Sequence, residues 1–151
     1  MKRTLLSLVA AMLIAATASA SVPNDEISVA GLYIGSAEDV VYKMYGQPQS
    51  VTHDAAGNTL IYERMQVSVN GLGSIVSIRT TSSRYQSTPA GANVGANKER
   101  IIGLYGEPDE TIVGEELSIY RYFNEDRKQY IDFISESRTG SIVEILAGNK
   151  E

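Results

Sequence analysis

The sequence contains no cysteine and no tryptophan, and it has a single histidine, His53. The absence of cysteine excludes disulfides, thiolate metal sites and a thiol nucleophile, and it also excludes lipidation at a signal-peptide cysteine. The fold must therefore be stabilised by its apolar core. A Ser-His-Asp arrangement could use only His53, and no serine stands at a strand-to-helix elbow. We predict that the protein has no catalytic residue and is not an enzyme.

Basic side chains are fewer than acidic ones. The chain has 13 lysine and arginine side chains against 18 aspartates and glutamates. Without Lys2 and Arg3, which lie in the predicted leader, 11 basic side chains remain and the net charge is −7. Nucleic acid and anionic membrane surfaces are poor partners for such a chain. We therefore expect no nucleic-acid partner.

A long hydrophobic run occurs only at the start of the chain. Lys2 and Arg3 precede an apolar run from Leu5 to Ala16, and Ala18-Ser19-Ala20 follows. This pattern predicts a signal peptide over residues 1–20 with cleavage after Ala20, because the apolar run is shorter than the roughly 20 residues that span a bilayer. We expect an exported protein, periplasmic or secreted, without a membrane anchor after cleavage.

Two stretches of the chain resemble each other at an offset of 60 residues, the distance from Tyr45 to Tyr105. Residues 30–48 and 90–108 share six identities in 19 positions, where chance gives about one. The identical pairs are Ala30 and Ala90, Gly31 and Gly91, Gly35 and Gly95, Tyr45 and Tyr105, Gly46 and Gly106, and Pro48 and Pro108. The matches fall on turn and cap positions, which indicates a duplicated unit.

Each stretch predicts a short helix with a sharp end. Gly46 and Gly106 suit the left-handed position just past a helix, and the prolines two residues later, at positions 48 and 108, cannot continue one. Ser36 is expected to be the first N-cap, with Asp39 completing a capping box. Ala96 cannot cap, so Asn97 is expected to cap the second helix, and the two starts then differ by one residue.

The paired positions also predict which side of each helix packs on a sheet. A helix of this length needs packing, because it is too short to be stable in water alone. The pairs that are apolar or aromatic in both helices are Val41 and Ile101, Met44 and Leu104, and Tyr45 and Tyr105. Position 40 becomes Arg100 in the second helix and is expected at the edge of the contact.

Alternating segments after each helix predict antiparallel strands separated by turn residues. The predicted strands are 49–53, 59–63, 66–69 and 75–80 after the first helix, and 117–123, 129–135 and 141–145 after the second. Residues 74–78 match 141–145 at an offset of 67, so the second meander is longer. In the first closing strand, Val76 and Ile78 are expected to share a face.

These patterns predict an α+β protein of two tandem repeats, each a short helix packed on an antiparallel meander of three to four strands. The predicted segments are a signal peptide (1–20), a first repeat (21–79), a linker (80–89), a second repeat (90–148) and a polar tail (149–151). Whether the two meanders share one sheet is left open.

The helices ending Tyr-Gly-x-Pro, the aromatic strands near Tyr62 and Tyr120 and the closing Ile-Val-x-Ile strands resemble two known groups. One is the SmpA/OmlA type of small envelope domain, and the other is the tandem-repeat β-lactamase inhibitor protein fold. The resemblance implies an exported protein that binds other proteins without catalysis. The chain departs from both groups, since it has neither a lipoprotein cysteine nor disulfides.

The nine tyrosines are the most promising material for recognition. Tyr45 and Tyr105 are expected to be structural, whereas Tyr62, Tyr120, Tyr122 and Tyr130 lie on predicted strands. In a sheet covered on one face only, alternation sends some strand residues outward, and outward tyrosines suit protein recognition. The alternative is that these four cover the second sheet face or the joint between the repeats.

Acidic side chains crowd the region that follows the second helix. They are Glu107, Asp109, Glu110, Glu115 and Glu116, and their spacing does not follow a calcium-loop pattern. Gly91 and Gly95 precede a helix but lack the Lys-Ser/Thr of a phosphate loop. We therefore predict no cofactor and no metal, although weak cation binding by residues 107–116 stays open.

Three functions follow in order of preference. The first is a non-catalytic binding module that recognises another protein in the envelope or outside the cell. The second is a small-ligand or cation-binding protein, using the acidic stretch or the cleft between the repeats. The third is a hydrolase that depends on His53.

Overall fold

The computed structural model describes residues 21–84 and 88–150. The predicted signal peptide, residues 85–87 of the predicted linker and Glu151 lie outside the described residues. The described part is an α+β fold in which strands predominate. Its elements are η1 (Asn24–Glu26), β1 (Ser28–Val29), β2 (Leu32–Tyr33), α1 (Glu38–Tyr45), β3 (Ser50–His53), β4 (Gly57–Ile61), β5 (Met65–Asn70), β6 (Ile75–Thr80), α2 (Lys98–Tyr105), β7 (Glu110–Val113), β8 (Leu117–Phe123), β9 (Gln129–Glu136) and β10 (Ile142–Asn149).

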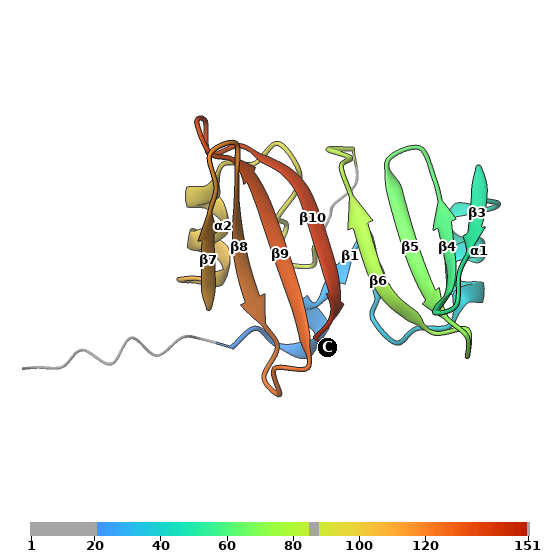
Figure 1. Cartoon of the computed structure of the whole chain (residues 1–151). Coiled ribbons are helices and arrows are strands. Elements are labelled where there is room, and N and C mark those ends of the chain that lie inside the picture. The colour runs from blue at the N-terminus through green and yellow to red at the C-terminus, as the bar shows by residue number, and fades with distance from the viewer. Residues whose placement is uncertain (1–20, 85–87, 151) are drawn as a thin grey trace, which may run out of the picture.

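Eight strands form one antiparallel sheet in the order β3-β4-β5-β6-β10-β9-β8-β7 (Figure 1). Each meander runs along the chain from the outer edge to the middle, where β6 pairs with β10. The two meanders therefore share one continuous sheet, with β3 and β7 as its edges. The short strands β1 and β2 pair separately as a two-stranded ribbon.

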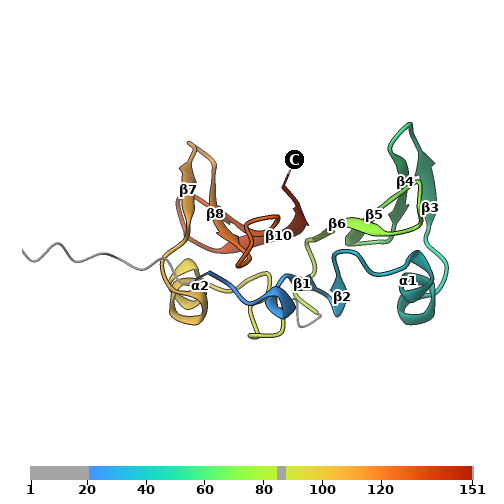
Figure 2. The same ribbon diagram turned by 90° about the horizontal axis from the view of Figure 1, so that it is seen from below.

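The helices and the β1–β2 ribbon cover the same face of this sheet (Figure 2). No element of the described residues covers the opposite face. The outer hairpins β3–β4 and β7–β8 bend away from the helices, so the uncovered face curves inward between them (Figure 2). This layered arrangement puts the whole core on one side of the sheet.

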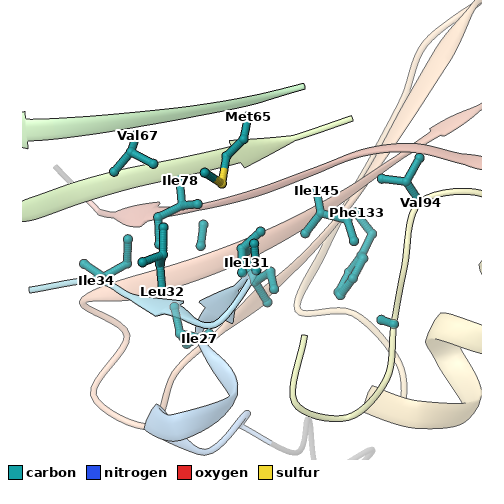
Figure 3. Packing of buried hydrophobic residues seen from close by; sticks show 14 of the residues in the cluster. Ile27, Leu32, Ile34, Met65, Val67, Ile78, Val94, Ile131, Phe133 and Ile145 are labelled. Carbon is teal, nitrogen blue, oxygen red and sulfur yellow. The ribbon is translucent and has the colours of Figure 1, made fainter. Parts of the chain in front are cut away.

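The core lies between the sheet and the layer of α1, β1, β2 and α2. Side chains that alternate toward this layer are fully or almost fully buried, and Figure 3 shows Val67, Ile78, Ile131, Phe133 and Ile145 among them. Ile27 and Leu32, from the N-terminal segment, pack against these strands. Burying such a side chain stabilises the fold by about 1.5–3 kcal/mol.

The two helices begin at equivalent positions, so the predicted one-residue shift is wrong. Asn97 caps α2 as predicted, because its side chain accepts a hydrogen bond from the Glu99 amide. Ser36 does not cap α1, whose N-cap is Ala37 without a side-chain bond. The chain is instead paired to the sheet at this point, since the Ser36 carbonyl accepts from the Ile75 amide at 2.8 Å and Ala37 forms a β-bridge with Ser74.

The two helices also end at equivalent positions. α1 ends at Tyr45 and α2 at Tyr105, and a glycine with positive φ follows each of them. Pro48 lies in the loop between α1 and β3, and Pro108 lies in the equivalent loop between α2 and β7. Neither proline is part of a helix or a strand, which agrees with the stop that the sequence predicts for both helices.

The packed side of each helix is narrower than predicted. Val41 and Ile101 are fully buried, and Tyr105 is also buried. Met44 and Leu104, however, are 49% and 39% exposed, so their predicted packing on the sheet is wrong. An eight-residue helix presents only one turn to the sheet, and positions i and i+4 fill that contact.

Several strands differ from the predicted ones. The sequence does not predict β7, because its acidic surroundings resemble a loop. β10 extends to Asn149, beyond the predicted end at Ile145. Ile75, rather than Val76, shares the core face with Ile78, because a shift in the β5–β6 register falls at this point. The β9–β10 pairing has an equivalent shift between Ile142 and Glu144.

Candidate functional site: the uncovered face of the sheet

We call the sheet surface opposite the helices the open face. Its side chains are the strand residues that alternate with the buried ones. In the C-terminal half, these residues form rows that cross from strand to strand, because paired residues of neighbouring strands lie side by side. The strand pairing therefore determines which side chains meet.

One row on the open face is apolar. Ile112 of β7 pairs with Ile119 of β8, which pairs with Ile134 of β9. Ile112 is 50% exposed, and Leu117 of the same hairpin is 49% exposed. Three isoleucines in a row, with further apolar surface at the hairpin, give this half of the open face a water-exposed apolar patch.

The next row is charged and tightly paired. Glu110, Arg121 and Asp132 follow one another across β7, β8 and β9. The Arg121 guanidinium donates two hydrogen bonds of 2.7 Å to the two carboxylate oxygens of Asp132. It also lies 3.7 Å from the Glu110 carboxylate. This bidentate geometry fixes both side chains before any partner arrives.

The electrostatics of this pair follow from burial. Asp132 is only 2% exposed although it lies on the open face. Burial raises the pKa of the Asp132 carboxyl above its usual range, and the hydrogen bond and charge of Arg121 oppose this shift. The hydrogen bond to Asp132 raises the pKa of Arg121 in turn. Removing Arg121 would leave the buried Asp132 carboxylate unpaired, whereas removing Asp132 would leave Arg121 with Glu110 as its remaining partner.

Tyr130 lies across the neighbouring strand at Gly148, with which it pairs. A Cβ at Gly148 would come within 2.9 Å of the Tyr130 hydroxyl oxygen, so glycine leaves the room that the ring occupies. The Arg121 guanidinium carbon lies 4.4 Å from the centre of the Tyr130 ring. This cation–π contact joins Tyr130 to the charged row.

A second ion pair crosses the middle of the sheet. Arg79 of β6 donates two hydrogen bonds of 2.7 Å to Glu144 of β10. The N-terminal half of the open face is different, because its next row consists of hydroxyl side chains on β3 to β6: Thr52, Thr59, Ser68 and Ser77. In the N-terminal half, Ile61 of β4 stands between Ser50 and Gln66 on this face, so no apolar row forms through it.

Of the four tyrosines predicted to bind, only Tyr130 lies on the open face. Tyr120 and Tyr122 alternate toward the helices, and Tyr122 is fully buried with its hydroxyl donating to the Gly106 carbonyl. Tyr62 follows β4, and its hydroxyl donates to the Gly46 carbonyl at 2.8 Å. Three of the four thus serve packing in this structure.

The sequence analysis missed Arg121, Asp132 and the isoleucine row. The signal that could have found them is alternation along β8, where residues 119 and 121 share one face and 120 and 122 the other. Both faces of this strand carry large side chains, so alternation alone could not tell which face is buried. On β8, the sequence analysis offers Tyr120 and Tyr122 as candidates for the outward face, whereas the structure places Ile119 and Arg121 there.

The other predicted sites are dispersed. His53 lies exposed on the edge strand β3, with Nδ1 2.7 Å from the Asn58 side-chain oxygen. Asp109 accepts hydrogen bonds from the Phe123 amide and the Arg127 side chain. Within residues 21–84 and 88–150, no group of three or more histidines and carboxylates is placed to hold a metal ion. Over the same residues, no helix has the length and apolarity that crossing a bilayer requires.

Comparison with known proteins finds similar folds but no matching family. The sequence matches no protein-family model, and no curated protein is similar to it. One similar solved structure is an extracellular protein containing an SCP domain from Bacillus anthracis, with TM-score 0.58 and 11% identity over 99% of this chain and 50% of that one. Another is a cysteine-rich secretory protein from Staphylococcus aureus, with TM-score 0.60 and 13% identity over 87% and 49%.

A third similar structure is the DUF4309 family protein YjgB from Bacillus subtilis, with TM-score 0.55 and 18% identity over 80% of this chain and 83% of that one. This chain spans about half the length of the first two neighbours. At these identities, the likeness concerns the fold alone. None of the three is described as an SmpA/OmlA-type domain or a β-lactamase inhibitor protein.

Proposed function

We propose that this chain is a non-catalytic binding module that recognises another protein through the C-terminal half of its open face. The observation that carries the proposal is the isoleucine row beside the Arg121–Asp132 pair on an uncovered sheet. An apolar centre with a fixed, polar margin is the usual composition of a protein-recognition surface. Because the ion pair is preformed, a partner would lose little entropy in ordering it.

A protein partner fits this surface better than a small ligand does. Ile112 and Leu117 are about half exposed, on a hairpin at the edge of the sheet. Four cavities among the described residues have none of the three isoleucines in their walls. Broad apolar surfaces rimmed by charge gain most from burial against another protein. Binding of cations by residues 107–116 is a weaker alternative, since Asp109 and Glu110 already have protein partners.

We propose further that the chain arose by duplication of one unit, with repeats over residues 21–79 and 90–148. Matched contacts support this. The Gly35 amide donates to the Ile75 carbonyl at 2.7 Å, and the Gly95 amide donates to the Ile142 carbonyl at 2.7 Å. The glycines that follow the two helices have similar positive φ angles, 72° and 79°. Only the second unit carries the apolar row, which is consistent with one copy having specialised.

We propose that the protein acts outside the cytoplasm, in the periplasm or as a secreted protein. The predicted signal peptide supports this location. Two of the similar structures are described as an extracellular protein and a secretory protein. The absence of cysteine means that the fold does not depend on an oxidising compartment.

The test is partner capture with matched variants of the mature chain. Ile112→Asp and Ile119→Asp place a charge in the apolar row, and Thr52→Asp places the same charge at the opposite end of the open face. We expect the two isoleucine variants to lose a partner that the native chain and Thr52→Asp both retain from envelope or secreted fractions. Equal capture by all four chains, each shown to be folded by circular dichroism, would remove the proposed surface.

A further inference from the structure

A cavity of about 300 Å³ lies beside the β4–β5 connection, on the N-terminal half of the molecule. It is away from the isoleucine row and from the acidic stretch. Its lining comes from the end of α1, the loop before β3, residues 62–64 between β4 and β5, the first residue of β5 and the segment after β6. The lining residues are Tyr45, Gln49, Tyr62, Glu63, Arg64, Met65, Ser82 and Arg84.

The residues of the C-terminal half that match the wall at Tyr62 and Arg64 are buried. Tyr122, which stands 60 residues after Tyr62, is fully buried, and Asn124, which stands 60 residues after Arg64, is only 3% exposed. Val22 packs beside them, because its amide donates to the Phe123 carbonyl at 3.1 Å and its side chain is buried, and together with Tyr105 it lines a separate cavity of about 300 Å³. The cavity beside Tyr62 therefore depends on the residues of the N-terminal half, where Tyr62 and Arg64 replace the buried Tyr122 and Asn124.

Two arginines of the cavity wall are available for a ligand. Arg64 and Arg84 are exposed, and neither forms an ion pair with any residue of the described ranges. In contrast, Arg79, Arg121 and Arg127 each bind a carboxylate of the chain. Two guanidinium groups on one small cavity outweigh the single carboxylate of the wall, and guanidinium is the side chain best suited to carboxylate and phosphate.

The rest of the wall is aromatic and apolar. The rings of Tyr45 and Tyr62 lie 6.0 Å apart at an angle of 59°. Met65 is buried and contributes a polarizable thioether to the same wall. A volume of about 300 Å³ is at the lower end of small-molecule sites, which combine an apolar wall with a few polar groups.

We propose that this cavity binds a small organic anion. A carboxylate or phosphate group would lie against Arg64 and Arg84, and an apolar or aromatic body would contact Tyr45, Tyr62 and Met65. This site is independent of the proposed protein-binding surface, because the two share no residue. Experiments can therefore refute either proposal without affecting the other.

Nuclear magnetic resonance titration of the ¹⁵N-labelled mature chain tests the site. The probes are benzoate, phenyl phosphate, inorganic phosphate and the neutral benzyl alcohol, each to about 10 mM, ten times the concentration that corresponds to a binding free energy of about −4 kcal/mol. We expect saturable amide shifts at residues 62–65 and 82–84 with one or both aromatic anions. Inorganic phosphate and benzyl alcohol should bind at least about tenfold more weakly. Inorganic phosphate lacks the aromatic body, and benzyl alcohol lacks the anionic group. Comparing benzoate with phenyl phosphate distinguishes the two anion types.

Matched variants separate recognition from general charge. Arg64→Gln and Arg84→Gln should each weaken binding about tenfold, as expected for loss of one charge-assisted contact. Arg100→Gln and Arg138→Gln remove exposed arginines elsewhere and should leave it unchanged. Arg64→Lys should restore part of the affinity. The proposal is overturned if neither aromatic anion gives saturable shifts, or if the Arg100 and Arg138 variants weaken binding as much as the cavity variants do.

Discussion

At the scale of single residues, burial differs most clearly among the tyrosines. Tyr105 and Tyr122 lie in the core, and burial raises the pKa of both hydroxyls well above the ordinary value of 10.0. Tyr105 is held by Thr88, whose hydroxyl lies 2.7 Å from the phenol oxygen. Both rings also contact Phe133. Both are structural residues, and the folded state favours their protonated, neutral phenols.

This burial predicts the behaviour of the protein at high pH. In the unfolded chain the phenols ionise near their ordinary pKa, whereas in the folded chain Tyr105 and Tyr122 stay protonated. Their contribution to stability is therefore complete below about pH 10 and is lost progressively above it. Phenolate absorbance should show exposed tyrosines titrating first and the buried pair only together with loss of the circular dichroism signal. Titration of all tyrosines in one step, with the fold intact, would contradict this placement.

Ser135 provides a second prediction at this scale. Its hydroxyl is buried and has no hydrogen-bond partner among the described residues. Ser118 opposite is also buried, but its hydroxyl lies 2.9 Å from that of Ser137. Since an unpaired buried hydroxyl costs free energy, Ser135→Ala should leave the free energy of unfolding unchanged or raise it by up to about 1 kcal/mol. Ser118→Ala should lower it by about 1 kcal/mol. Urea unfolding compares the two, and the reverse order would refute the assignment.

At the scale of elements, the two helices occupy matched places but have different caps. Asn97 caps α2 with its side chain, while Ala37 at the equivalent position of α1 does not. We expect Asn97→Ala to lower the free energy of unfolding by about 1 kcal/mol and Ala37→Asn to raise it by a similar or smaller amount. Thermal and urea unfolding of both variants measure this. No loss in Asn97→Ala would mean that the cap contributes nothing in the folded protein.

The same scale shows how far the sequence predicts this fold. β6 and β8 are found with the same ends as in the structure, because turn residues flank segments rich in β-branched and aromatic side chains. The helix ends are also predicted, since Pro48 and Pro108 are local signals. β7 is missed, because the acidic residues around it are typical of loops. Ser36 is misread as a cap because pairing with β6 takes up its backbone, and such long-range pairing leaves no local signal.

The candidate site is predictable only in part for a similar reason. The sequence indicates outward tyrosines on a one-sided sheet, and Tyr130 does lie outward. The sequence does not show which face of β8 is buried, because Ile119 and Arg121 alternate with Tyr120 and Tyr122. That choice depends on which face α2 covers, and the contact between the Tyr105 and Tyr122 rings decides it.

At the scale of the whole molecule, the β6–β10 pairing joins the two halves. Ile78 pairs with Ala147 at this joint, and both side chains are fully buried. The core is one cluster that extends across the joint. We therefore expect the described part of the chain to unfold as one cooperative unit rather than as two.

A charge at the joint tests this cooperativity. Ala147→Asp would bury an unpaired carboxylate and should destabilise the fold by about 3 kcal/mol or more. Hydrogen exchange should then show loss of protection in β5 as well as β9, although the substitution is in β10. Ser68→Asp, on the open face, is the control and should change protection little. If β9 alone lost protection, the halves would be independent units.

The C-terminal half of the open face is the proposed binding surface for a protein partner. The most direct test is photo-crosslinking in the producing cells, with a photoreactive residue placed at Ile112 or Ile119, and at Thr52 as the control on the same face. We predict one adduct of the same mass and the same partner from both isoleucine positions, and none from Thr52. No adduct from either isoleucine position, or the same adducts from Thr52, would contradict the account.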